Sequence, residues 1–180
     1  MHNIKELLYE DRIEKGAYRL HSGYRRGGEG IIGRLYGSRV TAIDNRQEEL
    51  DEAPDTCTKL CMDATALSFA DESFDAVTAF YSLLFMTAGE QERAIAEGIR
   101  VLCPSGRLCL WDCVVESAYP NPFVTELDVD LEGELLHTSY GICKLDAQSR
   151  ESILSFCLAK GLTLLTSRQE GIHFYLELQK

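Results

Sequence analysis

The sequence lacks any long apolar run. No stretch of about 18 consecutive apolar residues, the length that a membrane-spanning helix needs, occurs among its 180 residues. The first 15 residues, MHNIKELLYEDRIEK, are polar and amphipathic, and they contain neither the apolar stretch nor the cleavage site of a secretory signal. We therefore expect no membrane partner and a cytoplasmic location.

Basic residues are scarce relative to acidic ones. The chain has 18 lysines and arginines against 29 aspartates and glutamates, which gives a formal net charge of -11. A protein that binds the phosphate backbone of a nucleic acid needs a basic face. We therefore expect no nucleic-acid partner.

The histidines and cysteines also lack the spacing that the ligands of a metal site have. The four histidines are scattered, and the seven cysteines include two C-x3-C pairs, Cys57/Cys61 and Cys109/Cys113. On a strand, as we expect for the second pair, this spacing separates the sulfurs by roughly 13 Å, too far to share one metal ion. The first pair could meet only on a helical turn. Most of the cysteines lie in apolar runs such as LCLWDC, which suits buried free thiols in a reducing compartment, and we expect no metal site.

The sequence does contain an alternation of strand and helix patterns up to residue 115. Periodic apolar positions predict a helix over residues 1–15 and another over 89–102. The other predicted elements are strands over 17–23, 39–44, 58–64, 76–81 and 107–115, a short helix over 30–36 closed by Gly37, a helix from 48 that Pro54 ends, and a turn at Pro104-Ser105-Gly106. Such alternation favours a parallel α/β sheet.

The pattern changes after residue 115. Residues 126–142 alternate on both sides of Glu132-Gly133, which predicts a β-hairpin. Residues 145–161 predict a helix that begins with Asp146 as its N-cap and ends at Gly161. Two strands follow, over 162–169 and 172–179, and the short turn between them requires an antiparallel pair.

A glycine-rich loop precedes the second predicted strand. In RRGGEGIIGRLYG, residues 25–37, Gly28, Gly30 and Gly33 spell G-x-G-x-x-G. Such a loop lets the backbone approach a ligand closely, and the helix after it offers free N–H groups. Asp44, at the end of the next strand, can accept both hydroxyls of a ribose. The motif therefore indicates a dinucleotide or another nucleoside compound; alternatively, the loop is a tight turn and Asp44 is an ordinary helix cap.

Two further stretches, CMDATALSFADESFDAVTAFYSLLFM and IRVLCPSGRLCLWD, follow the glycine loop and Asp44. In this combination, over about residues 22–115, the sequence resembles the class I S-adenosylmethionine-dependent methyltransferases, in particular type 11-like members. The resemblance implies one α/β domain over residues 1–180, a Rossmann-like three-layer sandwich. Its mostly parallel seven-stranded sheet would have an antiparallel C-terminal strand, and a hairpin insertion over 119–143 would follow strand five.

The resemblance also implies where the nucleoside part of S-adenosylmethionine binds. Asp44 would hold the ribose hydroxyls, and Asn45 would lie beside the adenine. Asp63 and Ala64 would face the adenine, where a carboxylate and an N–H group can bind its polar edge. Alternatively, Asp63 is a helix cap.

The remaining residues carried over from the resemblance surround the methionine and the methyl group. Gly28, Glu29 and Gly30 would line the methionine end of the cofactor, whose product is S-adenosylhomocysteine. Phe80, Tyr81 and Ser82 would lie where the sulfonium and the acceptor meet, although Phe80 could equally be a core residue. All these positions follow the carboxyl ends of parallel strands, where open α/β sheets bind ligands.

The sequence departs from the family before and after the glycine loop. The stretch LHSGYRRGG has no carboxylate where the family usually has one; it has Arg25 and Arg26 instead, and Glu29 is the candidate substitute. The interval from Gly30 to Asp44 is about one helical turn shorter than usual. The arm before the loop is also short, which leaves the site either open or closed by a second subunit, as in a homodimer.

A methyl acceptor that carries a proton needs a base. Tyr81, Glu116 and His137 are the candidates by position, and we select Tyr81 and His137 as candidate catalytic residues. The predicted hairpin insertion, with Tyr119, Phe123 and Tyr140, either covers the site or simply packs against the domain. We expect the acceptor to be a small molecule or a protein side chain.

Two other functions remain open. A non-catalytic protein of the same fold would explain the missing carboxylate, and a site obstructed by Tyr24 or Arg25 would support it. A clear cavity beside Phe80 and Tyr81 would support the enzyme. An NAD(P)-dependent oxidoreductase would explain G-x-G-x-x-G and Asp44, but the antiparallel end of the sheet counts against it.

Overall fold

A computed structural model provides the structure, and it describes residues 2–3, 17–21, 36–51, 55, 57–116, 119–131, 134–144 and 146–180. Statements about structure concern these ranges. The glycine loop and its neighbours, including Tyr24, Arg25, Arg26, Gly28, Glu29, Gly30 and Gly33, lie outside the described residues. None of the described helices is long and apolar enough to span a membrane.

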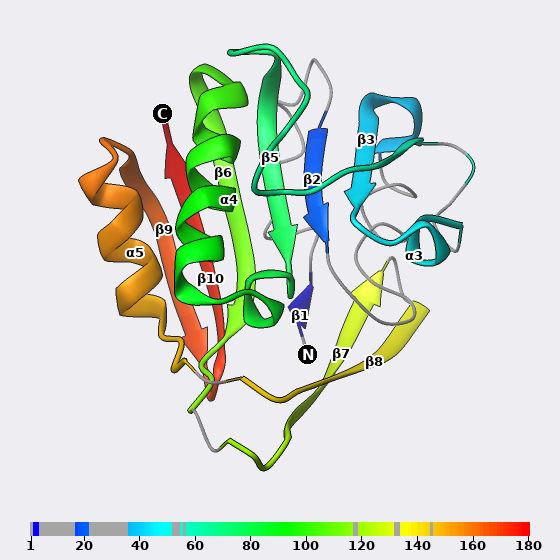
Figure 1. Ribbon diagram of the computed structural model, residues 1–180, viewed down its shortest axis with the longest axis vertical. Helices are drawn as coiled ribbons and strands as arrows, with labels where there is room; N and C mark the ends of the chain where they lie inside the picture. Colours follow the sequence, from blue (N-terminus) through cyan, green and yellow to red (C-terminus); the bar gives the residue numbers. More distant parts are fainter. Residues whose placement is uncertain are drawn as a thin grey trace.

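The main sheet has the strand order β4-β3-β2-β5-β6-β10-β9 (Figure 1). Its strands are β2 (Ala17–His21), β3 (Val40–Asp44), β4 (Thr58–Cys61), β5 (Phe74–Phe80), β6 (Leu102–Cys113), β9 (Thr163–Glu170) and β10 (His173–Gln179). Pairing is parallel from β4 to β6, whereas β10 is antiparallel to both β6 and β9. The predicted mostly parallel sheet and its antiparallel C-terminal pair are therefore confirmed.

A second, smaller sheet contains β1 (His2–Asn3), β7 (Phe123–Leu131) and β8 (Glu134–Ile142). β7 and β8 pair antiparallel, and β1 pairs parallel with β7. The predicted helix over residues 1–15 is therefore wrong at His2 and Asn3, whose backbone pairs with a strand edge instead of forming a helical turn. Residues 4–15 of that prediction lie outside the described residues.

Helices α4 (Ala88–Val101) and α5 (Arg150–Ala159) cover one face of the main sheet (Figure 1), and α3 (Gln47–Asp51) follows β3. A capping box begins α4: the Thr87 hydroxyl accepts from the Glu90 N–H, and the Glu90 carboxylate accepts from the Thr87 N–H. This confirms the predicted helix over 89–102. Of the predicted helix over 30–36, only Tyr36 lies within the described residues, and it precedes a 3-10 turn over Gly37–Arg39.

Helix α5 begins later than predicted. Its N-cap is Ser149, whose hydroxyl accepts from the Ser152 N–H at 3.1 Å, while the Ser152 side chain satisfies the Ser149 N–H. The predicted N-cap, Asp146, instead accepts a hydrogen bond from the backbone N–H of Ala88 at 3.3 Å. The prediction was wrong because two residues that can cap a helix, Asp146 and Ser149, lie three positions apart. The helix begins after Ser149, which is the one nearer to the apolar segment.

The predicted turn at Pro104-Ser105-Gly106 lies inside β6 as an irregularity. Phe74 pairs with Leu102 and Ala76 pairs with Arg107, so β6 carries extra residues over this interval. Ser105 takes the left-handed conformation, with φ of 65°. The strand therefore begins at Leu102 rather than at the predicted residue 107, and it continues through a bulge.

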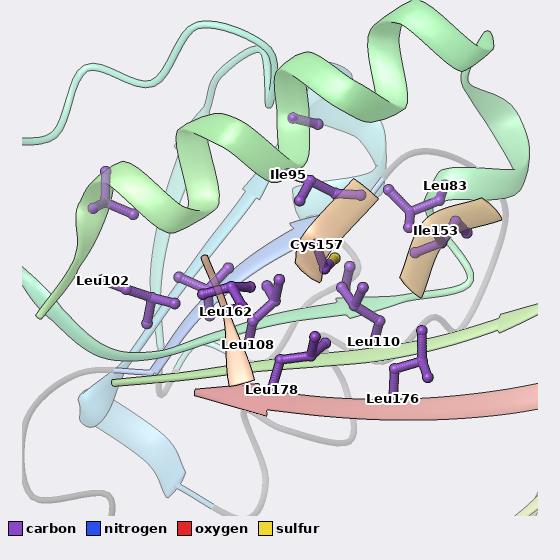
Figure 2. Close-up of a cluster of buried hydrophobic side chains, with 14 of the residues drawn as sticks. Leu83, Ile95, Leu102, Leu108, Leu110, Ile153, Cys157, Leu162, Leu176 and Leu178 are labelled. Atoms are coloured by element: carbon purple, nitrogen blue, oxygen red, sulfur yellow. The ribbon is translucent and has the colours of Figure 1, made fainter. Parts of the chain in front are cut away.

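The core on the helical face is aliphatic. Figure 2 shows leucine and isoleucine side chains of α4, α5 and the sheet packed together, among them Ile95, Leu108, Leu110, Ile153 and Leu176. The opposite face is aromatic, and its buried residues include Phe80, Tyr81, Trp111, Tyr140 and Tyr175. The two faces of one sheet therefore differ in chemistry.

The bulge in β6 generates a stability prediction. A Cβ on Gly106 would lie 2.8 Å from the carbonyl oxygen of Cys103 and 3.1 Å from that of Asp75, and neither backbone atom can move freely. We expect Gly106→Ala to lower the free energy of unfolding by about 1–3 kcal/mol. Gly89→Ala is the matched control, because its Cβ would meet only the flexible end of Arg93 at 3.6 Å. Urea unfolding measures both, and equal effects would contradict the account of the bulge.

Candidate functional site

The predicted site residues follow three strands along one edge of the sheet. Asp44 closes β3, Asp63 follows β4, and Tyr81 follows β5. Because β3, β4, β2 and β5 are mutually parallel, these strand ends meet at the same edge. Such an edge, where strand order reverses around β2, is where open α/β sheets bind ligands.

Asp44 is buried, with 1% of its surface exposed. Its Oδ1 accepts from the backbone N–H of Arg46 at 2.8 Å, and its carbonyl accepts from the N–H of Met62 at 2.8 Å. The carboxylate therefore closes a local turn and does not cap α3, which begins at Gln47. A carboxylate can accept about four hydrogen bonds, so this turn does not exhaust it. Asn45, the next residue, is exposed.

Asp63 forms a turn of its own. Its Oδ1 accepts from the Thr65 N–H at 2.8 Å and from the Thr65 hydroxyl at 2.9 Å, and the side chain is exposed. No helix follows it, so the helix-cap alternative is wrong for this residue. Ala64 is half-buried against the aliphatic core. This part of the edge thus has one buried carboxylate, at Asp44, and one exposed carboxylate, at Asp63.

The turn after β5 is buried throughout, from Phe80 to Ser82. Tyr81 has a left-handed backbone, with φ of 50°, a conformation that costs energy in a non-glycine residue and that clusters at functional sites. Its N–H donates to the carbonyl of Trp111 at 2.7 Å, which ties the turn to β6. The Phe80 ring packs edge-on against Tyr81, with centroids 5.1 Å apart.

The Tyr81 side chain joins two distant parts of the chain. Its ring stacks on Tyr140 of β8, with centroids 5.0 Å apart and an interplanar angle of 4°. Its hydroxyl lies 2.6 Å from Nδ1 of His173, at the start of β10. Burial, followed by the nearby Cys113 and Asp112, raises the pKa of Tyr81 well above its usual value. The phenol therefore keeps its proton at neutral pH, and the tautomer of His173 sets which of the two groups donates in this hydrogen bond.

The other candidate catalytic residues are not brought to Tyr81. His137 lies on β8 three residues from Tyr140, and therefore on the other face of the strand. Its Nδ1 pairs with Asp128 across the hairpin at 2.8 Å, which raises the pKa of the exposed imidazole. Glu116 is exposed beyond the end of β6.

The hairpin aromatics divide in the same way. Tyr140 is buried against Tyr81, and Phe123 packs against the same aromatic cluster. Tyr119 is 60% exposed. The hairpin is therefore docked through Tyr140 and Phe123, and Tyr119 takes no part in that contact.

Sequence reasoning missed Asp112, which is fully buried under this turn. Its Oδ2 accepts from the backbone N–H groups of Leu83 at 2.9 Å and Leu84 at 3.3 Å. Its Oδ1 accepts from the N–H of Cys113 at 2.8 Å and from Nε2 of Gln148 at 2.6 Å. The carboxylate thus connects β6, the turn after β5 and the segment before α5.

Gln148 extends this network to α4. Its Oε1 accepts from Nε2 of Gln91 at 2.5 Å and from Nζ of Lys144 at 2.9 Å. Gln91 also donates to the carbonyl of Leu83 at 2.8 Å. Four polar side chains, from β6, α4 and the segment between β8 and α5, therefore surround the backbone of Leu83 and Leu84.

Burial dominates the electrostatics of the network. It raises the pKa of Asp112 to about 6 despite the hydrogen bonds that favour the carboxylate. Burial also lowers the pKa of Lys144, although Asp112 opposes that shift. A single signal in the sequence could have found this network: an aspartate inside the apolar run LCLWDCVV needs buried partners.

The described residues form no metal site, and most of their thiols are shielded from solvent. Within the described ranges, no group of three or more His, Cys, Asp or Glu side chains could hold a metal ion. The side chains of Cys57, Cys109, Cys113 and Cys157 are buried thiols. Burial raises the pKa of Cys109 to about 12, so its thiol stays protonated at neutral pH.

Asp112 should leave a pH signature on stability. Its folded-state pKa of about 6 exceeds the unfolded value of about 3.9, so the folded state binds the proton more tightly. This tighter binding of the proton adds to the free energy of unfolding. The addition is complete below pH ~4 and is lost as the pH rises to about 6. The free energy of unfolding of wild type minus that of Asp112→Asn should therefore fall by on the order of 2 kcal/mol between pH 4 and pH 7.

Urea unfolding at the two pH values measures this difference. Asp112→Asn should also be the less stable protein at both pH values, because an amide cannot accept from four donors and leaves at least one of them buried without an acceptor. A difference between wild type and variant that does not change with pH would contradict the assignment of Asp112 as a carboxylate buried on folding.

Comparison with known families agrees with this architecture. Residues 27–110 match the family described as "Methyltransferase domain". A curated relative, the demethylmenaquinone methyltransferase of Renibacterium salmoninarum, is 46% identical over 65 residues. That match covers 35% of this chain and 25% of the relative, so the chain aligns with about a quarter of the relative's length.

Solved structures share the fold over nearly the whole chain. An S-adenosylmethionine-dependent methyltransferase from Mesorhizobium loti superposes with a TM-score of 0.69 at 13% identity, covering 98% of this chain and 95% of that one. The glycopeptide N-methyltransferase MtfA complexed with S-adenosylmethionine superposes with a TM-score of 0.56 at 14% identity, covering 94% and 88%. That neighbour therefore binds S-adenosylmethionine on the same fold. The resemblance found in the sequence is therefore confirmed: the chain has the fold of the S-adenosylmethionine-dependent methyltransferases, and its residues 27–110 match their methyltransferase domain.

Proposed function

We propose that this protein transfers the methyl group of S-adenosylmethionine to a small molecule or a protein side chain. The observation that carries the proposal is the single edge along which β3, β4 and β5 end, with buried Asp44 at one end and the buried Tyr81 turn at the other. Open α/β sheets bind ligands along such an edge. Asp44 and the Tyr81 turn can therefore contact the nucleoside and the methyl group of the same cofactor.

Asp44 fits the ribose of the cofactor. It is a buried carboxylate at a strand end, held by the Arg46 N–H in one orientation, and carboxylates there accept ribose hydroxyls. Asn45, Asp63 and Ala64 continue the same edge and would surround the adenine. We also propose that Gly28, Glu29 and Gly30 hold the methionine part of the cofactor.

The Tyr81 turn would form the methyl side of the site. S-adenosylmethionine supplies an electrophilic methyl group, so the protein's own residues have to orient the acceptor and exclude water. Phe80, Tyr81 and Ser82 are buried and closely packed, which suits both tasks. Tyr81 is the stronger candidate for proton transfer, because its hydroxyl is hydrogen-bonded to His173 and His137 faces away from Tyr140. The acceptor class, a cytoplasmic location and a homodimer remain parts of the proposal.

A non-catalytic role is the second candidate function. Tyr140 of the hairpin packs directly on Tyr81, so a side chain of the protein itself covers the ring that we assign to the methyl side. The sequence also lacks the carboxylate that the family usually has before its glycine loop. An oxidoreductase gains no such support, since β10 of this chain runs antiparallel to β6.

Isothermal titration calorimetry with S-adenosylhomocysteine tests the proposal. Wild type should bind, and Asp44→Asn should weaken binding by roughly 10- to 100-fold, because charged hydrogen bonds to the ribose are lost. Asp51→Ala is the matched control: Asp51 is exposed on α3, where its carboxylate accepts from Nε2 of Gln47 at 2.9 Å. It should bind like wild type.

Failure of folded wild type to bind either S-adenosylhomocysteine or S-adenosylmethionine would favour the non-catalytic candidate. Unchanged binding by Asp44→Asn would place the nucleoside elsewhere. Circular dichroism of each variant establishes that a loss of binding is not a loss of fold.

A further inference from the structure

The polar network under the turn after β5 is satisfied for only one protonation state of Asp112. The carboxylate accepts four hydrogen bonds, from the backbone N–H groups of Leu83, Leu84 and Cys113 and from Nε2 of Gln148. All four partners are donors, and none of them can accept a hydrogen bond in return. The hydrogen bonds of the structure are therefore those of ionised Asp112.

Gln148 passes this direction on to the next residues. Because its Nε2 points to Asp112, its Oε1 is free to accept from Nε2 of Gln91 at 2.5 Å and from Nζ of Lys144 at 2.9 Å. Lys144 also donates to the carbonyl of Leu83 at 3.3 Å. The stronger of the two printed bonds of Lys144 thus depends on which way the Gln148 amide is turned.

A proton on Asp112 has to reverse one of these hydrogen bonds. The backbone N–H groups are fixed by the strand and the turn, so only the Gln148 amide can rotate and offer its oxygen to the new O–H. The rotation removes the donor that Gln148 supplies to the carbonyl of Cys113, and it turns Nε2 toward Gln91 and Lys144. Gln91 can rotate in its turn and accept, but an ammonium has no acceptor and has to leave.

Lys144 connects the hairpin to this network. It lies two residues beyond the end of β8, on the segment that runs from the hairpin toward α5 (Figure 1). Among the described strands, β7 and β8 pair with each other and with β1 but not with the main sheet. Side chains therefore hold the hairpin on the domain: Tyr140 stacks on Tyr81, and Lys144 binds at the base.

Burial sets the protonation of the groups that face Asp112. It raises the pKa of Asp112 to about 6, and it raises the pKa of the Tyr81 phenol and of the Cys113 thiol well above their usual values. The phenol and the thiol keep their protons while Asp112 titrates. Gln148 and Lys144 lower the pKa of Asp112, so by linkage its ionisation and the binding of Lys144 favour each other.

Two carboxylates and one imidazole complete the charged surroundings. Glu90 of α4 and Asp146, before α5, favour the charged form of Lys144, which burial disfavours. Asp146 is exposed, so it offers Lys144 a position outside the network. His173, which is hydrogen-bonded to Tyr81, belongs to the residue type that ordinarily titrates near neutral pH, and an experiment has to separate it from Asp112.

We propose that Asp112, Gln148 and Lys144 form a pH-sensitive latch for the hairpin of β7 and β8. With Asp112 ionised, Lys144 fastens the base of the hairpin to the turn after β5. With Asp112 protonated, the Gln148 amide rotates and Lys144 lets go. Because Tyr140 of the hairpin covers Tyr81, opening the latch uncovers the turn that carries the proposed methyl side of the site. The latch itself uses residues of this chain alone and is independent of the proposed function.

Hydrogen–deuterium exchange of the hairpin, residues 123–142, at pH 7.5 and pH 5 tests the latch. Each rate is divided by the intrinsic exchange rate at that pH. We expect the wild-type hairpin to exchange about three- to tenfold faster at pH 5, the range expected for losing one hydrogen bond to a charged group. Peptides of α4 and β10 should show no such change, because they lie in the packed domain.

Two variants assign the effect to the network. Asp112→Asn carries a donor on its side chain permanently, as the protonated acid does, so its hairpin should exchange fast at both pH values. Lys144→Met keeps the apolar stem without the ammonium, and it should also be fast at both; it leaves Asp112 in place should Asp112→Asn fail to fold. Lys160→Met is the matched control, because this exposed lysine lies against Phe156 of α5, and it should behave like wild type.

Three results would overturn the latch. They are a wild-type hairpin whose corrected exchange is the same at both pH values, a Lys144→Met hairpin as protected at pH 7.5 as wild type, and a pH dependence that persists in Asp112→Asn. The last result would assign the titration to another group, such as His173. None of these readouts involves a cofactor, so they do not decide whether the protein binds S-adenosylmethionine.

Discussion

The buried carboxylate of Asp112 is the interaction on which the candidate site depends. It lies in the centre of the sheet, on β6, and accepts the N–H groups of Leu83 and Leu84 just beyond the turn that carries Tyr81. A carboxylate taken out of water needs such donors, and Gln148 supplies a further one from the segment before α5. The cost of burying the charge, visible in the raised pKa of Asp112, is thus offset by fixing the backbone beside the site.

The turn after β5 is held in two chemically different ways. On its polar side the Asp112 network with Gln91 and Gln148 fixes the backbone that follows Ser82. On its aromatic side, the Tyr81 ring is fixed by stacking and by one hydrogen bond to His173. The left-handed backbone of Tyr81 persists because both sides constrain it. A rigid turn of this kind keeps one side of the proposed site in place.

Local sequence patterns predicted the strands and the position of Asp44 at a strand end. The apolar run AVTAFY predicted β5, and the position of Asp44 at the end of RVTAID follows from the strand before it. Patterns failed where partners are distant. Tyr81 meets His173 across 92 positions, and Asp112 meets Gln148 across 36, and no periodicity encodes such pairs. They also failed where two local signals competed, as at the start of α5, where Ser149 rather than Asp146 caps the helix.

A crystal structure of the protein with S-adenosylhomocysteine tests the central claim most directly. The claim is that one sheet edge, from Asp44 on β3 to the Asp112-anchored turn after β5, binds the cofactor and faces the acceptor. The account predicts the ribose hydroxyls on the carboxylate of Asp44 and the sulfur directed toward Tyr81, with the Leu83 and Leu84 N–H groups still on Asp112. A nucleoside bound away from Asp44, or a turn after β5 released from Asp112, would contradict it.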